Sequence, residues 1–165
     1  MAKKELKTNA MRILEKKKIP YKIHRYECKE FIDGIVIADM LNEPYERVFK
    51  TLVTVGKSGG HFVFVIPIHK ELDLKKAAKS VGEKSVEMIH VKDINKITGY
   101  IRGGCTAIGM KKEYPTVLDK SAKNQQTIMV SGGKNGIQIE LTPEDYLKAC
   151  HGKTEEITHL GGAEK

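Results

Sequence analysis

Residues 48–55 (VFKTLVTV) constrain the fold most, because they predict a β-strand that is apolar on both faces. The side chains of a strand alternate between two faces, and here apolar residues occupy both sets of positions. A strand of this kind is usually covered by other elements on both sides. Residues 61–68 (HFVFVIPI) are predicted to pair with it as a hairpin, across a turn at residues 56–60. The chain must therefore place covering layers on both faces of this hairpin.

Lys50 is the exception within the first of these strands. Its neighbours on the same face, Val48 and Leu52, are both apolar. A charged side chain at such a position must extend to solvent, form an ion pair or face a wet cleft. A lysine on an edge strand, which discourages aggregation, is the structural alternative to a cleft lysine. The strand pattern by itself leaves these alternatives open.

Helical and strand patterns alternate along the 165 residues, with no internal repeat, low-complexity segment or linker. We expect one domain over residues 1–165, with roughly seven N-terminal and roughly 12 C-terminal residues as flexible ends. The expected fold class is mixed α/β, with a strongly bent, barrel-like mixed sheet surrounded by helices. Helices are predicted at residues 10–19, 34–41, 74–81 and 92–98 and from 142 onward, and strands at 21–26, 48–55, 61–68, 86–90 and 116–118 and twice within 127–141.

The charge balance is basic, with 29 Lys and Arg against 21 Asp and Glu and a formal net charge of +8. Such a surplus attracts polyanions such as nucleic acid, although solubility alone also explains many basic domains. No apolar run approaches the roughly 20 residues that span a bilayer, and the first residues do not resemble a signal peptide. We therefore expect a cytoplasmic protein that does not bind membranes.

Common catalytic and metal-binding motifs are absent from the sequence. It has no GxSxG, no HExxH, no Walker A motif and no GxGxxG that opens a helix, which argues against serine hydrolases, zinc proteases and kinases. Cys28, Cys105 and Cys150 form no CxxC pair, so we expect reduced thiols. His24 lies four residues before Cys28, but that segment is expected to be extended and no second pair completes a metal site. No cofactor and no metal are expected.

Two glycine-rich loops remain after these exclusions, at residues 103–109 (GGCTAIG) and 131–133 (SGG). Glycine permits positive φ and close backbone approach, so two such loops can aim several N–H donors at one point. From spacing alone, a tight turn is the better explanation of each loop. Together with Lys50, the two loops favour a binding site.

Five segments in chain order carry a resemblance: KTNAMRILEKKKIPY, VFKTLV, LKKAAKSVG, TGYIRGGCTAIGMKK and TIMVSGGKNGIQIEL. They resemble the YbaK family of free-standing aminoacyl-tRNA deacylases, which are relatives of the editing domain inserted in bacterial prolyl-tRNA synthetases. The resemblance implies an enzyme that hydrolyses cysteine wrongly attached to tRNA(Pro), working beside prolyl-tRNA synthetase and without binding DNA. Cysteine and proline are similar in size, and one pocket rejects a near-isostere by only about 1–3 kcal/mol, so a second site is needed.

The resemblance also implies which residues act. Lys50 would hold the terminal adenosine phosphate or the ester oxygen, and the Gly103 and Gly104 loop would donate backbone N–H groups to the developing oxyanion. The cysteinyl thiol would attack its own ester carbonyl, because the protein offers no nucleophile. The residues implied to bind the substrate are Tyr26, Phe31, Thr51, Cys105, Thr106, Ala107, Ser131, Gly132 and Gly133.

Ala107 departs from the family pattern, in which a GxxxP loop ends in proline. Alanine can adopt the φ that proline fixes, so the expected cost is about 0.4–1 kcal/mol of stability rather than a lost site. Two alternatives to a cysteinyl-tRNA deacylase stay open. One is a deacylase for alanyl- or seryl-tRNA, and the other is a non-catalytic module that binds tRNA or the synthetase.

Overall fold

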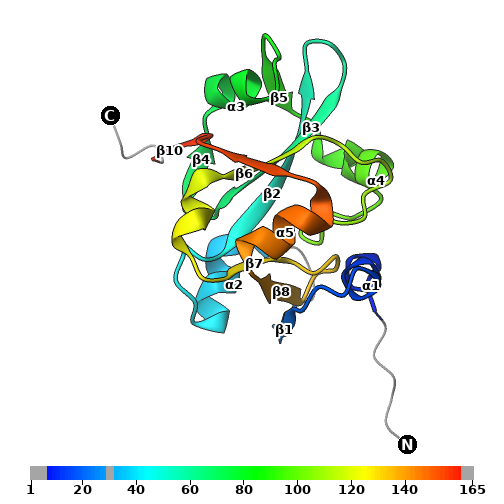
Figure 1. The fold of residues 1–165 in the computed structure, drawn as a ribbon, viewed down its shortest axis with the longest axis vertical. Coiled ribbons are helices and arrows are strands. Elements are labelled where there is room, and N and C mark those ends of the chain that lie inside the picture. The colour runs from blue at the N-terminus through cyan, green and yellow to red at the C-terminus, as the bar shows by residue number, and fades with distance from the viewer. Residues whose placement is uncertain (1–6, 29–31, 161–165) are drawn as a thin grey trace, which may run out of the picture.

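Short helices surround a mixed β structure in the computed structural model, which describes residues 7–28 and 32–160 (Figure 1). The mixed α/β class predicted from the sequence is confirmed. The helices are α1 (Asn9–Lys16), α2 (Gly34–Leu41), α3 (Leu74–Ser80), α4 (Ile94–Thr98) and α5 (Pro143–Cys150), with the 3-10 helices η1 (Val91–Asp93) and η2 (Lys120–Asn124). The strands are β1 (Lys22–Arg25), β2 (Phe49–Gly56), β3 (His61–Pro67), β4 (Lys70–Leu72), β5 (Val86–Met88), β6 (Thr116–Asp119), β7 (Ile128–Ser131), β8 (Ile137–Leu141), β9 (Lys153–Glu155) and β10 (Thr158–Leu160).

The largest sheet has five strands in the order β5-β2-β3-β6-β9. The predicted hairpin of β2 and β3 is antiparallel, with Phe49 opposite Pro67, and Gly56 N donates to Gly60 O (2.7 Å) in its turn. β6 pairs in parallel with β3 on one side and with β9 on the other. The sheet is therefore mixed, as expected.

A second sheet has the order β1-β8-β7 and is antiparallel throughout. Among the described residues, one isolated parallel bridge joins it to the largest sheet, between Val48 just before β2 and Met129 of β7. The strands β4 and β10 form a separate two-stranded ribbon. Within the described ranges, the expected barrel-like sheet is thus divided into three sheets and no closed barrel forms.

Both faces of the β2–β3 hairpin are buried, as its sequence predicts. Val63 and Val65 belong to a core that also contains Tyr146 of α5, while Phe64 and Ile66 point into a second core against α3. All five side chains are fully buried. Alternate residues of one strand thus pack into two different cores, which explains why the strand is apolar on both faces.

Capping threonines fix the start of two helices, as the sequence signals predict. Thr8 Oγ1 accepts a hydrogen bond from Met11 N (3.1 Å), and Thr142 Oγ1 accepts one from Asp145 N (3.1 Å) at the start of α5. The Thr8 hydroxyl also donates to Gly132 O (2.6 Å). This second bond ties the start of α1 to the SGG turn. No helix in residues 7–28 and 32–160 is long and apolar enough to cross a membrane.

The sequence did not predict four short elements, namely β4, η2, β9 and β10. Within the C-terminal stretch for which flexibility is expected, β10 pairs with β4, with Thr158 opposite Leu72. Three-residue strands are too short to show an alternating pattern, so only tertiary pairing defines them. The same expectation for residues 1–6 and 161–165 lies outside the described residues.

Candidate functional site

The β2 edge that faces away from β3 is only partly paired. β5 pairs with this edge at residues 54–56, and Val48 makes the bridge to β7. Among the described residues, no strand pairs with this edge at Lys50, Thr51 or Leu52. These three residues line a cavity of about 280 Å³, which we call the β2 cavity. Lys50 therefore lies where one edge of β2 has no neighbouring strand, although the rest of β2 is inside the sheet.

The β2 cavity is walled by the start of α2, the β5–η1 segment, the glycine loop and the β7–β8 hairpin. Its apolar side chains include Ile37, Ile68 and Met88. The polar side chains of the lining belong to one acid, two bases and three neutral residues: Asp33, Lys50, Arg102, Thr51, Ser131 and Gln138. An apolar cavity with a few convergent polar groups is the usual form of a small-ligand site.

Lys50 is half-buried, and its ammonium makes no hydrogen bond or ion pair with any residue in the described part of the chain. The neighbouring Thr51 hydroxyl is buried close to the phenol of Tyr146. A partly desolvated ammonium attracts an anion more strongly than one in bulk water does. The two predicted residues are thus placed together, and Lys50 is the one that can hold a negative charge.

Gln138 is a cavity residue that the sequence interpretation missed. Its side chain is only 4% exposed and its Oε1 atom accepts no hydrogen bond in the described structure. A buried polar atom without a partner costs free energy unless a ligand or water satisfies it. The signal in the sequence was weak, because β8 (IQIEL) alternates and Gln138 shares its polar positions with Glu140.

The glycine loop contributes Gly103 and Cys105 to the cavity but not Gly104. Gly103 has a φ of 87°, and the N–H groups of Gly103 and Cys105 have no backbone acceptor among the described residues. Gly104 N instead donates to Ile101 O (2.9 Å). The expected oxyanion donors are therefore reduced to the N–H groups on either side of Gly104.

Gly104 has a packing role. A Cβ atom at this position would lie 2.9 Å from Lys134 Cα and 3.1 Å from Lys134 N. Because both of these are backbone atoms, they cannot swing away as the end of a side chain can. The glycine loop therefore touches the β7–β8 turn only because Gly104 has no side chain. The two predicted glycine loops do lie side by side.

In the SGG turn, only Ser131 lines the cavity. Gly132 N donates to Ile137 O (2.9 Å) in the hairpin, and Gly133 N donates to Ser131 Oγ (3.1 Å). Gly133 has a φ of 102°, which favours glycine. The two glycines thus shape the turn and hold the Ser131 hydroxyl, while their own N–H groups are occupied.

Four other predicted residues lie away from the cavity lining or outside the described structure. Tyr26 contacts Gln138 and donates its N–H to Gly136 O (3.0 Å), and burial raises the pKa of its phenol. Thr106 is fully buried. Ala107 lines another cavity, of about 520 Å³, between α1 and α5. Phe31 lies outside the described residues.

The structure offers no activated nucleophile at the cavity. Burial raises the pKa of the Cys105 thiol to about 11, which keeps it protonated near neutral pH. His24 Nε2 lies 2.7 Å from Glu140 Oε1 rather than in a cluster with Cys28. No group of three or more His, Cys, Asp or Glu residues that could hold a metal occurs within the described ranges.

Residues 35–149 match the family model described as the aminoacyl-tRNA editing domain, and the chain belongs to this family. An Enterococcus faecalis protein named "Putative Cys-tRNA(Pro)/Cys-tRNA(Cys) deacylase EbsC" is 51% identical over 161 residues, covering 96% of this chain and 98% of its own length. The resemblance found in the five sequence segments is confirmed.

Solved structures agree on the fold. One described as "a putative trans-editing enzyme for prolyl tRNA synthetase" has a TM-score of 0.80 at 21% identity, with 94% of this chain and 99% of that chain covered. A hypothetical protein has a TM-score of 0.82 at 17% identity, with 92% and 99% covered. At these identities the likeness concerns the fold alone.

Proposed function

We propose that the protein is a trans-editing deacylase that hydrolyses the ester bond of cysteinyl-tRNA, with misacylated Cys-tRNA(Pro) as its substrate. The observation that carries this proposal is the 51% identity to a protein of that name over 96% of the chain. A match of that length covers the β2 cavity as well as the scaffold around it. The chemistry of the cavity gives independent support.

Lys50 and the loop N–H groups supply what the reaction needs if the substrate provides its own nucleophile. The cysteinyl sulfur attacks the ester carbonyl carbon and forms a C–S bond, which closes a four-membered thiolactone. The bond between that carbon and the ribose oxygen breaks, and the proton lost by the thiol ends on the ribose hydroxyl. Water then opens the thiolactone to free cysteine. A buried, protonated Cys105 takes no covalent part.

The negative charge that develops on the carbonyl oxygen needs donors in a site that excludes bulk water. Gly103 and Cys105 line the cavity, and their N–H groups have no backbone acceptor among the described residues. One donor of this kind is typically worth about 3–4 kcal/mol in the transition state. Lys50 either adds to this stabilisation or holds the 3′-terminal phosphate.

The relative's name gives two tRNAs, which favours a site that recognises the cysteinyl group rather than the tRNA body. Selection of tRNA(Pro) would then come from a partner, and prolyl-tRNA synthetase is the partner that produces the error. A protein that acts on aminoacyl-tRNA beside a synthetase is expected in the cytoplasm.

A deacylation assay tests the proposal. Cysteine, S-methylcysteine, alanine, serine and proline are each esterified to tRNA(Pro), and cysteine is also esterified to tRNA(Cys). We expect fast release of cysteine from both tRNAs and little release of the other four residues. S-methylcysteine is the control for the thiol, because it keeps the sulfur but carries one methyl group more, has no thiol proton to transfer and cannot cyclise readily.

Other results of the same assay would support one of the alternative functions. Fast release of alanine or serine would show a water-dependent deacylase with another specificity. Fast release of S-methylcysteine would contradict thiol assistance. Binding of tRNA without release of any residue would show a non-catalytic module.

A further inference from the structure

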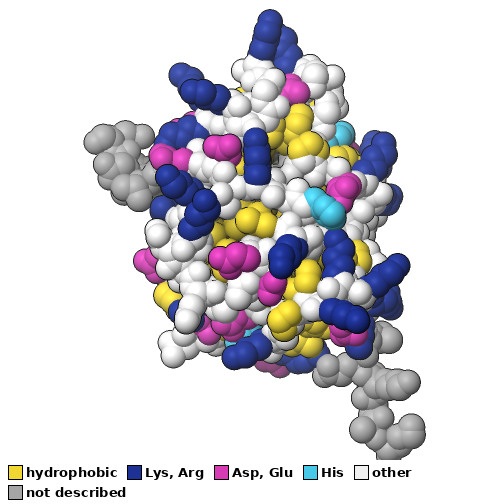
Figure 2. Space-filling view, viewed as in Figure 1, with side chains coloured by type: hydrophobic (Ala, Val, Ile, Leu, Met, Phe, Trp, Pro, Cys, Tyr) yellow, Lys and Arg dark blue, Asp and Glu magenta, His cyan; other side chains and the backbone are white. Residues whose placement is uncertain are grey.

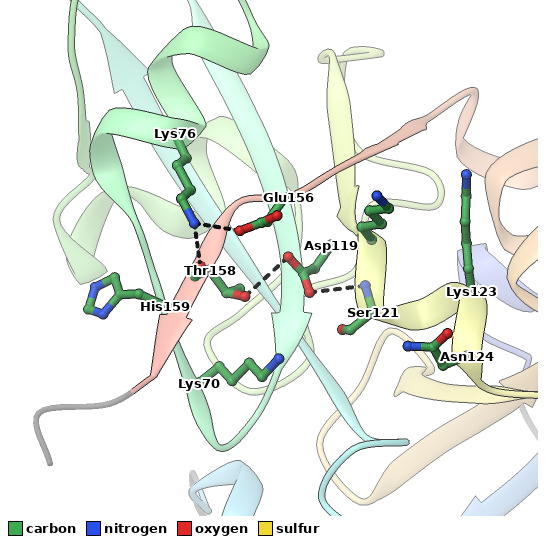
Figure 3. A pocket seen from close by; sticks show the side chains of 10 residues that line it. Lys70, Lys76, Asp119, Ser121, Lys123, Asn124, Glu156, Thr158 and His159 are labelled. Atoms are coloured by element: carbon green, nitrogen blue, oxygen red, sulfur yellow. Dashed lines mark hydrogen bonds and ion pairs between the residues drawn. The ribbon is translucent and has the colours of Figure 1, made fainter. Parts of the chain in front are cut away.

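Lysine and arginine side chains are spread over the face seen in Figure 2, interspersed with acidic ones, so surface charge alone does not single out a binding site. One groove does stand out. It has a volume of about 570 Å³, twice that of the β2 cavity, and lies between the β4–β10 ribbon and η2 (Figure 3). Four lysines line it, against two carboxylates, and we call it the lysine groove; the lysines are Lys70, Lys76, Lys120 and Lys123.

The two carboxylates of the groove are already engaged. Asp119 is 2% exposed, and its Oδ1 accepts from Ile157 N (3.1 Å) and Thr158 Oγ1 (3.2 Å), while Oδ2 accepts from Ser121 N (3.2 Å). Glu156 pairs with Lys76 at 2.7 Å. Asp119 therefore joins the two walls of the groove through hydrogen bonds, and Glu156 neutralises the charge of Lys76.

Three lysines are left without a hydrogen bond or ion pair from their side chains to any described residue: Lys70, Lys120 and Lys123. They come from both walls, with Lys70 on β4 and the other two on η2. In Figure 3 the Lys70 side chain extends from its strand toward the turn that carries Asp119 and Ser121. An excess of positive charge thus converges on the groove from two elements.

Ser121 adds a second observation. Its hydroxyl oxygen is buried and has no hydrogen-bond partner in the described structure, and the residue lines the groove. A buried hydroxyl is normally satisfied by protein or by a bound molecule. Lysines and a hydroxyl in one lining suit phosphate oxygens, which accept hydrogen bonds from both kinds of group.

The position of the groove indicates which phosphates it receives. Ile68 lines the β2 cavity and Lys70 lines the lysine groove, only two residues further along the chain. Two residues span at most about 7 Å. The two sites thus share one short segment of the chain, so a tRNA that runs from the β2 cavity along this segment would bring further phosphates to the groove. A volume twice that of the cavity also suits a stretch of backbone better than one small anion.

We propose that the lysine groove binds backbone phosphates of the acceptor arm of the substrate tRNA. The proposal rests on the proposed function for the choice of RNA, and it adds a second contact surface outside the reacting site. The groove contributes affinity for the body of the RNA, while the β2 cavity recognises the aminoacyl group.

The test compares two triple variants that lose the same charge. The groove variant loses the three unpaired lysines of the groove through the substitutions Lys70→Gln, Lys120→Gln and Lys123→Gln. The control variant loses three exposed lysines that line neither site, through the substitutions Lys57→Gln, Lys79→Gln and Lys84→Gln. The first measurement is the Kd for uncharged tRNA at several salt concentrations. The second is deacylation of full-length Cys-tRNA and of a cysteinyl ester of the trinucleotide CCA.

We expect the groove variant to bind uncharged tRNA at least about tenfold more weakly, with a salt slope smaller by about two to three, since each phosphate contact contributes roughly 0.9. Its KM for full-length Cys-tRNA should rise while kcat stays the same, and the CCA ester should react at the parental rate. The control variant should stay within about twofold of the parent in Kd. Arginine at the three groove positions should restore most of the affinity.

Three results would overturn the proposal. In the first, the groove variant binds tRNA as tightly as the control variant does. In the second, the groove variant also loses activity on the CCA ester, which would show that the lysines have a structural role. Calorimetry with ATP and with inorganic phosphate could show a tight site that the groove variant loses, which would assign the groove to a small anion. The uncharged-tRNA measurement does not depend on deacylation, so failure of the proposed function would be seen separately.

Discussion

At the residue scale, Lys50 combines an unpaired charge with a position at the unpaired edge of β2. We predict that Lys50→Ala lowers the deacylation rate at least about a hundredfold, which corresponds to a lost contact of about 2.7 kcal/mol. The melting temperature should change little, because no described residue pairs with the ammonium. Single-turnover deacylation of Cys-tRNA(Pro) and thermal unfolding measure the two effects.

Two variants control this prediction. Lys57→Ala removes an exposed lysine from the turn of the same hairpin and should leave the rate unchanged. Lys50→Arg should restore only part of it, because a planar guanidinium does not place its charge where a compact ammonium does. Parental activity of Lys50→Ala would show that the lysine serves only to keep the strand edge soluble.

Cys105 is the residue most easily mistaken for a nucleophile, since it lies in the glycine loop and lines the cavity. Burial raises the pKa of its thiol to about 11, so almost none of it is thiolate near neutral pH. Cys105→Ala should therefore keep the deacylation rate within about threefold of the parent, and iodoacetamide should label Cys105 slowly at pH 7. Complete loss of activity in a variant with the parental melting temperature would reverse this assignment.

At the scale of elements, the site depends on the contact between the glycine loop and the β7–β8 turn. We predict that Gly104→Ala destabilises the protein by about 1–3 kcal/mol, as overpacking does, because its Cβ would meet backbone atoms of Lys134. The loop would have to move, so deacylation should fall as well. Urea unfolding and the deacylation rate measure the two losses.

Gly60→Ala is the matched control for Gly104→Ala. The nearest heavy atoms to a Cβ at Gly60 lie 3.5 Å or more away, which is ordinary van der Waals contact. This variant should keep both its stability and its activity. Equal stability of the two variants would mean that the glycine loop is free to shift without loss.

At the scale of the whole molecule, buried acids make the stability depend on alkaline pH. Burial raises the pKa of Cys105 to about 11 from 9.0, that of Cys150 to about 12 from 9.0 and that of Tyr100 to about 12 from 10.0. Below about pH 9 the two thiols and the phenol stay protonated in both the folded and the unfolded chain. Above it the unfolded chain loses these protons first and binds fewer protons than the folded chain, so the free energy of unfolding falls as pH rises from about 9 to 12.

Urea unfolding between pH 8 and 11 measures this loss of stability. Replacing both Cys105 and Cys150 by alanine should make the decline above pH 9 shallower, whatever it costs in packing at pH 8. A free energy of unfolding that is constant up to pH 11 would contradict the pKa values of the buried thiols.

The sequence by itself determined the mixed α/β class, the buried hairpin, the capped helices and the family. These follow from local patterns: apolar residues on both faces of β2 and β3, hydroxyl caps at Thr8 and Thr142, and motifs whose order is fixed along the chain. Lys50 was identified as a site candidate for the same reason, because a charge between apolar neighbours is visible in one strand.

Only the tertiary structure decided which residues of each motif face the cavity. Gly103 and Cys105 line it while Gly104 packs against another turn, and Ala107 faces a different cavity, although all four occur in one short loop. Loop residues follow no period, so spacing does not give their direction. The partners of β4 and β10 and the convergence of lysines on one groove are likewise long-range contacts. Their physical basis is the burial of Asp119 between segments that are distant in sequence.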